Sequence, residues 1–342
     1  MSPGRLIVTG GAGFIGSAAI WQLNAMGYDD IVCVDALRTG DKWKNLVGLT
    51  VTDVLHKDDF LARLQRDANA FGDVAGLLHL GACSATTERD ADYLLANNTH
   101  YTRTLADWAL ACGTRFVYAS SAATYGDGAL GFDDDPAQLA SLVPLNMYGF
   151  SKHLHDLHAL RTGALSRVAG IKFFNVFGPN EYHKGDMMSV VCKAHRQVAA
   201  TGRLTLFRSH RERWAHGEQQ RDFVYVKDCT MVLAWLLEHP EANGLFNLGT
   251  GRARSWNDLA HAVFAAMGLP VAIDYVPMPE SIRDRYQYFT EARMDRLAAT
   301  GCPVPATSLE DAVRDYVTGY LAPGERTLGA ATLGTATHGA TP

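Results

Sequence analysis

The sequence predicts an α/β protein with a parallel sheet and a smaller second lobe that interleaves with the end of the first. Short apolar segments alternate with helical stretches over residues 1–174, and such alternation requires crossover connections, which favour a parallel sheet. The chain has 342 residues, roughly two domains at about 150 residues each. Hydrophobic residues make up 47% and charged residues 20%, an ordinary globular balance.

The elements of the first domain are predicted from short apolar runs and the segments between them. Residues 5–9 (RLIVT) and 31–34 (IVCV) are apolar runs that predict buried strands, with a helix over 14–26 between them. The same alternation continues with strands expected at 75–80, 115–119 and 168–174, and with helices expected at 57–70, at 90–112 and from near Asn146.

The composition changes after Gly178-Pro179, where segments become shorter and richer in Arg, His and turn residues. Helices are expected at 187–201, 227–238 and 256–267, a strand at 245–248, and a polar loop at 208–221. These elements predict a second lobe over 175–321, with about 223–250 returning to the first domain.

Two further segments carry predictions of their own. Residues 322–342 are mainly Thr, Gly, Ala and Pro and are predicted to be disordered, because they bury too little apolar surface to offset their ordering entropy. His153, His155 and His158 share one helix and are expected on its solvated face.

Charge and cysteine content exclude several functional classes. Lys and Arg number 31 against 36 Asp and Glu, a net charge of -5, so nothing indicates a nucleic-acid partner. No apolar run reaches the ~18–20 residues of a membrane span, and none resembles a signal peptide. The six cysteines form no C-x-x-C pair and no Cys/His cluster with zinc spacing. We therefore expect reduced cysteines, no metal, no membrane association and a cytoplasmic location.

A glycine pattern follows the first predicted strand and opens the first helix. Gly10, Gly13 and Gly16 have the G-x-x-G-x-x-G spacing. In this setting the first glycine allows a tight turn, the second lets the backbone approach a pyrophosphate, and the third allows close helix–sheet packing. The helix N-terminus adds N–H donors and partial positive charge. The pattern predicts a Rossmann-like, doubly wound sheet that binds a dinucleotide.

The residues after the second strand leave the choice of dinucleotide open. Asp35 closes that strand, and an acid there binds the adenosine ribose hydroxyls and favours NAD. Arg38, Lys42 and Lys57 lie just beyond it and are able to pair with a 2′-phosphate, which favours NADP. The sequence therefore leaves both NAD and NADP open.

A tyrosine and a lysine four residues apart point to acid/base chemistry. Tyr148 and Lys152 share one face of the predicted helix. Ser120 and Ser121 follow the strand 115–119 at the carboxyl edge of the sheet, where ligands of such sheets bind. A free phenol has a pKa of about 10, and a nearby ammonium together with a cationic nicotinamide favours phenolate. The pattern predicts a Tyr–Lys pair and a serine that orients a substrate hydroxyl.

Together these motifs resemble the nucleotide-sugar branch of the extended short-chain dehydrogenase/reductase family. A narrower similarity, over roughly residues 5–315, is to the ADP-L-glycero-D-manno-heptose-6-epimerases. The segments that carry it are HLGACSATTERD (79–90), NN (97–98), YASSAATYG (118–126), PLNMYGFSK (144–152), FFNVFGPNEYHKGDMMSV (173–190), QRDFVYVKD (220–228), FNLGTGRARS (246–255) and RYQYFT (285–290).

The resemblance implies an activity, a cofactor and an assembly. The activity is epimerisation at C6″ of ADP-D-glycero-β-D-manno-heptose, a precursor of the lipopolysaccharide inner core, by transient oxidation and re-reduction. The cofactor is one tightly bound NADP per subunit, with NAD possible on the residues alone. The protein would be a cytoplasmic homo-oligomer, typically a pentamer. Residues 1–174 would bind NADP and 175–321 mainly the substrate.

The resemblance also implies roles for individual residues. The catalytic residues would be Tyr148, Lys184 and Ser121. The cofactor-binding residues would be Gly10, Gly13, Phe14, Ile15, Gly16, Asp35, Lys42, Lys57, Leu80, Gly81, Ala82, Cys83, Ser84, Asn97, Lys152, Val176 and Lys184. The substrate-binding residues would be Ser121, Asn175, Asp186, Lys193, Phe207, Arg208, Ser209, His210, Arg221 and Tyr286.

Some positions depart from the family pattern, and the sequence also allows other activities. Leu80, Ala36, Lys193 and Asp186 replace an acid, an Asn, a His and a Ser. Arg221 either pairs with the ADP pyrophosphate or forms an internal ion pair with an acid such as Asp222. The alternative activity is that of a UDP-hexose 4-epimerase, which lacks the HKG segment. A non-catalytic NADP-sensing regulator is a third possibility, although such proteins usually lose the Tyr or the Lys.

Overall fold

A seven-stranded parallel sheet forms the body of the molecule. The computed structural model describes residues 4–283 and 286–336. The strand order is β10-β6-β5-β4-β1-β2-β3, with β1 at Arg5–Thr9, β2 at Ile31–Asp35, β3 at Asp53–His56, β4 at Val74–His79, β5 at Arg115–Ser121, β6 at Ala169–Phe173 and β10 at Gly244–Leu248. The chain leaves β1 toward β2 and later returns to its other side with β4, which confirms the predicted doubly wound fold.

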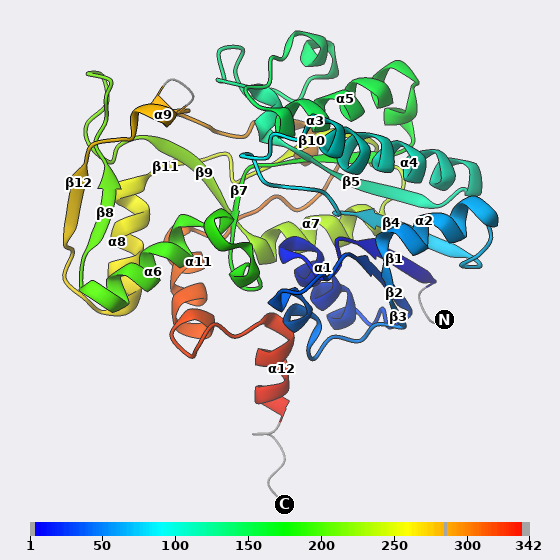
Figure 1. Ribbon diagram of the computed structural model, residues 1–342, viewed down its shortest axis with the longest axis horizontal. Coiled ribbons are helices and arrows are strands. Elements are labelled where there is room, and N and C mark those ends of the chain that lie inside the picture. The colour runs from blue at the N-terminus through cyan, green and yellow to red at the C-terminus, as the bar shows by residue number, and fades with distance from the viewer. Residues whose placement is uncertain (1–3, 284–285, 337–342) are drawn as a thin grey trace, which may run out of the picture.

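Helices cover both faces of this sheet (Figure 1). Helices α2 (Lys57–Arg66), α4 (Tyr101–Cys112) and α5 (Met147–Arg161) lie on one face, and α1 (Phe14–Ala25) and α7 (Val226–Glu238) on the other. Successive residues of β1 point to opposite faces, so Ile7 packs in the first core while Leu6 and Val8 pack in the second. Both faces are apolar because both are covered.

The second lobe is built from two small sheets and three helices. Strands β7 (Asn175–Phe177), β9 (Gln220–Tyr225) and β11 (Ala253–Ser255) form one sheet, and β8 (Leu204–Phe207) and β12 (Ile273–Val276) form the other. Helices α6 (Val190–Thr201), α8 (Trp256–Met267) and α11 (Leu309–Tyr316) share one core with them. The expected polar loop at 208–221 ends earlier than predicted, because β9 begins at Gln220.

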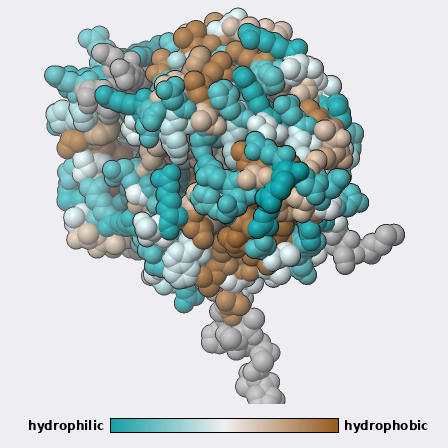
Figure 2. All heavy atoms as spheres, turned by 45° about the vertical axis from the view of Figure 1, so that its right-hand side comes forward, coloured by the Kyte–Doolittle hydropathy of each residue, from teal (hydrophilic) through white to brown (hydrophobic). Residues whose placement is uncertain are grey.

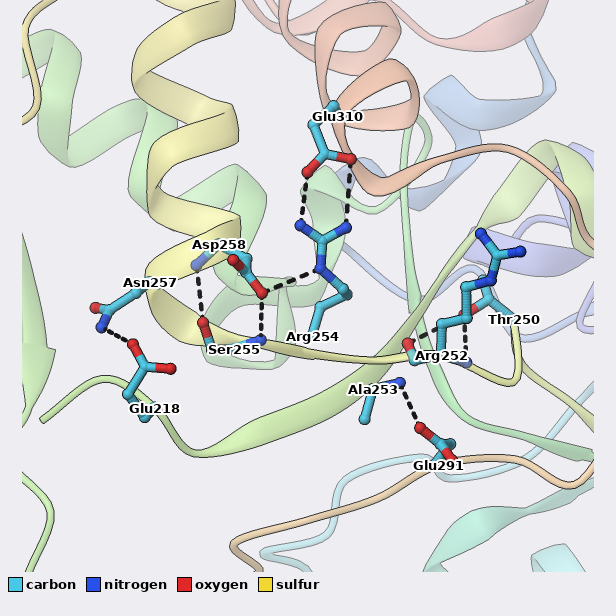
Figure 3. A network of polar contacts seen from close by, with 10 residues as sticks. All are labelled: Glu218, Thr250, Arg252, Ala253, Arg254, Ser255, Asn257, Asp258, Glu291 and Glu310. Carbon is cyan, nitrogen blue, oxygen red and sulfur yellow. Dashed lines mark hydrogen bonds and ion pairs between the residues drawn. The ribbon is translucent and has the colours of Figure 1, made fainter. Parts of the chain in front are cut away.

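Arg254 fastens three elements of this lobe (Figure 3). Its guanidinium binds Asp258 at 3.0 Å and Glu310 at 2.6 Å. The Ser255 side chain caps α8 by accepting a hydrogen bond from the Asp258 amide. These contacts join β11 to the start of α8 and to α11, a helix further along the chain whose Glu310 lies 56 residues after Arg254.

The prediction of a disordered tail is wrong for residues 322–336. This segment ends in helix α12 (Leu328–Ala336), and Leu328 is 1% exposed. The Leu328 amide donates to the Asn180 side chain at 2.8 Å, and Trp21 of α1 donates to Thr332 at 3.1 Å. One buried leucine and two hydrogen bonds therefore attach this weakly apolar segment to the rest of the protein. Residues 337–342 lie outside the described residues.

The visible surface mixes hydrophilic and apolar side chains. Figure 2 shows this for one face, with an apolar area beside the point where the C-terminal helix leaves the body. Over residues 4–283 and 286–336, no helix has the length and apolar character needed to cross a membrane.

Candidate active site

The glycines after β1 form a cradle that no larger residue fits. Gly10 has a φ of 67°, and a Cβ there would lie 2.7 Å from the Gly81 backbone after β4. A Cβ on Gly16 would lie 2.1 Å from the Gly10 carbonyl oxygen. Gly13 caps α1 without a side-chain hydrogen bond, and the first turn has no acidic residue. The helix therefore presents N–H donors to an anion at the point where the strand order reverses.

Asp35 and Lys42 lie together beside this cradle. The Asp35 carboxylate accepts a hydrogen bond from the Ala12 amide at 2.9 Å and contacts the Lys42 ammonium at 2.5 Å. Lys57 pairs instead with Asp58 at 2.7 Å. Arg38 is exposed, with a φ of 53°. Of the three predicted cations, only Lys42 contacts Asp35.

The backbone after β4 is held by Asn98, a residue the sequence reasoning did not assign. The Asn98 side chain is fully buried. It accepts from the Cys83 amide at 2.8 Å and donates to the Cys83 carbonyl at 3.0 Å, and it also donates to the Ser151 hydroxyl at 3.1 Å. Asn97 donates to Asn98 at 3.1 Å. The adjacent pair of asparagines was visible, but nothing in the sequence marks which one faces inward.

A cavity of about 310 Å³ brings the three predicted catalytic residues together. Ser121, Tyr148 and Lys184 all line it. The rest of its wall comes from the start of α1, beside the glycine cradle, and from the second lobe. It includes Phe14, Ile15, Asn175, Val176, Met188, Phe223 and Trp256. Residues from both lobes thus enclose one space next to the glycine cradle.

Alternation along β5 sends its two terminal serines in opposite directions. Ser120 donates to the buried Asp156 carboxylate at 2.6 Å, and Tyr118 donates to the same group at 3.0 Å. Ser121 faces the cavity, where it hydrogen-bonds Tyr148. Since successive strand residues point to opposite sides, only Ser121 is placed to meet a substrate.

Tyr148 and Lys152 lie in the first two turns of helix α5. Asn146 caps the helix by accepting from the Gly149 amide at 2.8 Å, which fixes Tyr148 in the first turn. Lys152 lies one turn on and donates to the Ala119 carbonyl at 2.7 Å. Burial raises the pKa of Tyr148, while its hydrogen bond with Ser121 lowers it. Burial lowers the pKa of Lys152 to about 8.

Lys184 enters the cavity from the opposite lobe. Its ammonium lies 5.1 Å from the centre of the Phe14 ring, a cation–π distance. It belongs to the 3₁₀ segment Tyr182–Met187, in which Gly185 has a φ of 54°. Burial lowers the pKa of Lys184, Glu181 raises it and Lys193 lowers it further. The environment therefore moves this amine toward the range where it exchanges protons.

Arg221 faces aromatic rings rather than an acid. Its guanidinium lies 5.3 Å from the Tyr286 ring and 5.8 Å from the Trp256 ring, and Trp256 donates to the Tyr286 hydroxyl at 2.9 Å. Asp222 instead accepts from the backbone of Thr250 at 2.7 Å. Among the residues that the structure describes, no carboxylate pairs with Arg221, and its guanidinium donates to the backbone carbonyls of Gln220 and Gln287.

The remaining predicted substrate residues lie outside the cavity wall. The Lys193 ammonium contacts the Asp186 carbonyl at 2.5 Å. Arg208, which follows β8, donates to the Tyr275 carbonyl at 2.8 Å. The His210 amide donates to the Tyr288 hydroxyl at 3.0 Å. The structure gathers Phe207 to His210 at the end of β8, apart from the three catalytic candidates.

Comparison with known proteins identifies the family of the chain. The profile of the NAD dependent epimerase/dehydratase family matches residues 6–249. The chain belongs to this family. Within it, an ADP-L-glycero-D-manno-heptose-6-epimerase of Nitratidesulfovibrio vulgaris is 57% identical over 316 residues, which cover 92% of this chain and 98% of that protein.

Two solved structures have the same fold. One is the ADP-L-glycero-D-manno-heptose-6-epimerase of Helicobacter pylori, with 26% identity and a TM-score of 0.73, covering 92% of this chain and 96% of that one. The other is a UDP-N-acetylglucosamine 4-epimerase of Methanobrevibacter ruminantium, with 20% identity and a TM-score of 0.77, covering 94% of this chain and 100% of that one. The second likeness concerns the fold alone.

Proposed function

We propose that the protein interconverts ADP-D-glycero-β-D-manno-heptose and ADP-L-glycero-β-D-manno-heptose by epimerisation at C6″. The observation that carries the proposal is the cavity where Ser121, Tyr148 and Lys184 meet beside the glycine cradle. The close relation to proteins of that name supports it. Lipopolysaccharide core synthesis is the process we assign to it.

The chemistry of the substrate explains why the site needs a nicotinamide. C6″ carries a secondary alcohol and has no adjacent carbonyl, so its hydrogen is not acidic and direct deprotonation is unfavourable. A bound nicotinamide dinucleotide supplies hydride acceptance and return. The glycine cradle would hold its pyrophosphate, Asp35 and Lys42 its adenosine ribose, and Lys152 its nicotinamide ribose.

The protein residues would take the proton from the oxygen on C6″ and later return it there. One group would remove the proton from the C6″ hydroxyl while the hydride passes from C6″ to the nicotinamide. After the ketone has turned its other face, a second group would return a proton to the carbonyl oxygen as the hydride returns to C6″. Tyr148 and Lys184 enter the cavity from different lobes, which suits two faces. Ser121 would orient the hydroxyl, and Arg221 would pair with the ADP pyrophosphate.

Incubation of the purified protein with ADP-D-glycero-β-D-manno-heptose, followed at C6″ by proton NMR without added cofactor, tests this function. We expect a mixture of the two epimers, because the cofactor co-purifies. No conversion even with NADP⁺ would reject the heptose assignment. UDP-hexoses would then be tested for 4-epimerisation.

The cofactor, assembly and location are part of the proposal. We assign NADP because Lys42 contacts Asp35 and so adds positive charge where a 2′-phosphate would lie. We propose a cytoplasmic homo-oligomer, a pentamer by resemblance, which light scattering on the purified protein would test.

A further inference from the structure

A buried carboxylate closes the loop that carries Lys184. Glu181 is fully buried. Its Oε1 accepts from the Ser189 hydroxyl at 2.7 Å, from the Tyr316 hydroxyl at 3.1 Å and from the Gly178 amide at 3.4 Å. Its Oε2 accepts from the Ser189 amide. One side chain therefore joins the start of the loop, its end and helix α11.

These bonds explain how a charge is tolerated there. An unpaired buried carboxylate is costly, and hydrogen bonds to its ionised form offset that cost. Burial raises the pKa of Glu181, while the Ser189 bonds and the charge of Lys184 lower it. The other titratable groups that feel its charge are Tyr182, Cys192 of α6 and Tyr316 of α11.

Glu181 also acts on the lysine at the middle of the loop, through its backbone and through its charge. The Lys184 amide donates to the backbone carbonyl of Glu181 at 3.0 Å, which fixes the turn between them. Across space, the carboxylate favours the ammonium form of Lys184 and opposes burial and Lys193. Position and protonation of Lys184 thus depend on one residue that does not line the cavity.

We propose that Glu181 is a positioning residue that joins the two ends of the loop and so holds Lys184 in the cavity. The inference rests on the proposed acid/base role of Lys184. The proton affinity of Lys184 separates this role from one in folding alone, because it changes only if the surroundings of that amine change.

Titration of Lys184 tests this directly, without turnover. Lysines are reductively methylated with ¹³C-formaldehyde, and the Lys184 signal is identified by its absence in Lys184→Met. In Glu181→Gln the pKa of Lys184 is expected to fall by about one unit or more, since an opposite charge nearby is lost. Glu325→Gln is the matched control; Glu325 pairs with Arg196 at 2.6 Å, and its loss should leave the titration unchanged. An unchanged Lys184 pKa in Glu181→Gln would overturn the proposal.

Turnover provides the second measurement. In Glu181→Gln, C6″ epimerisation should fall at least tenfold, and one limb of its pH profile should move to lower pH. If Glu181→Gln does not fold, Glu181→Asp replaces it: the shorter side chain keeps the charge but cannot span both loop ends, so kcat should fall with KM unchanged. A wild-type kcat in Glu181→Asp would contradict the proposal. Absent conversion by the wild type would reject the heptose function alone, since the titration still reports on Glu181.

Discussion

Tyr148 is the residue whose removal should separate binding from chemistry. It lines the cavity and hydrogen-bonds Ser121, so Tyr148→Phe removes the hydroxyl to which we assign proton transfer while keeping the ring. General acid/base groups contribute about a hundredfold to ten-thousandfold, and we expect kcat to fall by at least about a hundredfold. Tyr28→Phe, which removes a hydroxyl bound to Glu238, is the control and should retain activity. Full turnover by Tyr148→Phe would refute its role.

Lys42 should decide between the two dinucleotides. Its ammonium contacts Asp35, and a charge-assisted bond to a phosphate is worth about 1.5–3 kcal/mol. Lys42→Ala should therefore weaken NADP binding about tenfold or more and change NAD binding little, as measured by calorimetry on the cofactor-free protein. Lys44, which pairs with Asp41 at 3.0 Å on the same segment, supplies the control Lys44→Ala. Equal losses for both cofactors would count against a 2′-phosphate contact.

Three residues that the sequence singles out line one cavity, whereas the residues that support them are not predicted. Tyr148, Ser121 and Lys184 stand in recognisable motifs because their spacing or neighbours are unusual. Asn98 and Glu181 act through buried hydrogen bonds to distant backbone, and such partners depend on the fold. For Arg221 the sequence allows either a pyrophosphate or an acid as its partner. In the structure the Asp222 carboxylate instead accepts hydrogen bonds from the backbone amides of 250 and 251.

Helix α12 provides a prediction at the scale of one element. Leu328 is 1% exposed and Leu333 is 53% exposed, although both belong to the segment predicted to be disordered. Leu328→Ala should lower the free energy of unfolding by about 2–4 kcal/mol, measured in urea. Leu333→Ala should change it by less than about 0.5 kcal/mol. If neither substitution changes the free energy of unfolding, α12 does not pack against the rest of the protein.

Six strands of the large sheet were predictable from the sequence, whereas its edge strand β3 and the strands of the second lobe were not. Strands such as β2 are fully buried and therefore read as apolar runs. Strand β3 buries only Leu55 of its four residues, and its sequence DVLH carries no apolar run. The short strands β7 and β11 have three residues each. Their pairing partners come from distant parts of the chain, so local pattern gives little signal.

The stability of the whole molecule should depend on pH through a buried histidine. The sequence suggested a solvated helix face, which is wrong for His155: it is 2% exposed, packs edge-on against Tyr118 at 4.6 Å, and its ring nitrogens have no partner. Burial lowers the pKa of His155 to about 3. The unfolded chain therefore binds a proton below pH 6.5 that the folded protein does not, and stability falls as pH drops through that range.

The size of this effect is measurable by denaturant unfolding. Between pH 6.5 and 5 the loss from His155 should be about 2 kcal/mol, and His155→Gln should lose less stability over the same interval. Burial raises the pKa of Asp134 to about 6, which acts in the opposite direction and cancels when the two proteins are compared. Identical pH slopes would show that His155 takes up a proton in the folded state.

The chain crosses between the large sheet and the second lobe repeatedly, as β6 passes to β7, β9 to α7 and β10 to β11. The second lobe is therefore not one continuous segment of the chain, and recombination cannot exchange it as a unit. New substrates in such a lineage must be reached by point changes and loop replacements that leave these crossings intact. The same constraint applies to anyone who wishes to graft one relative's selectivity onto another.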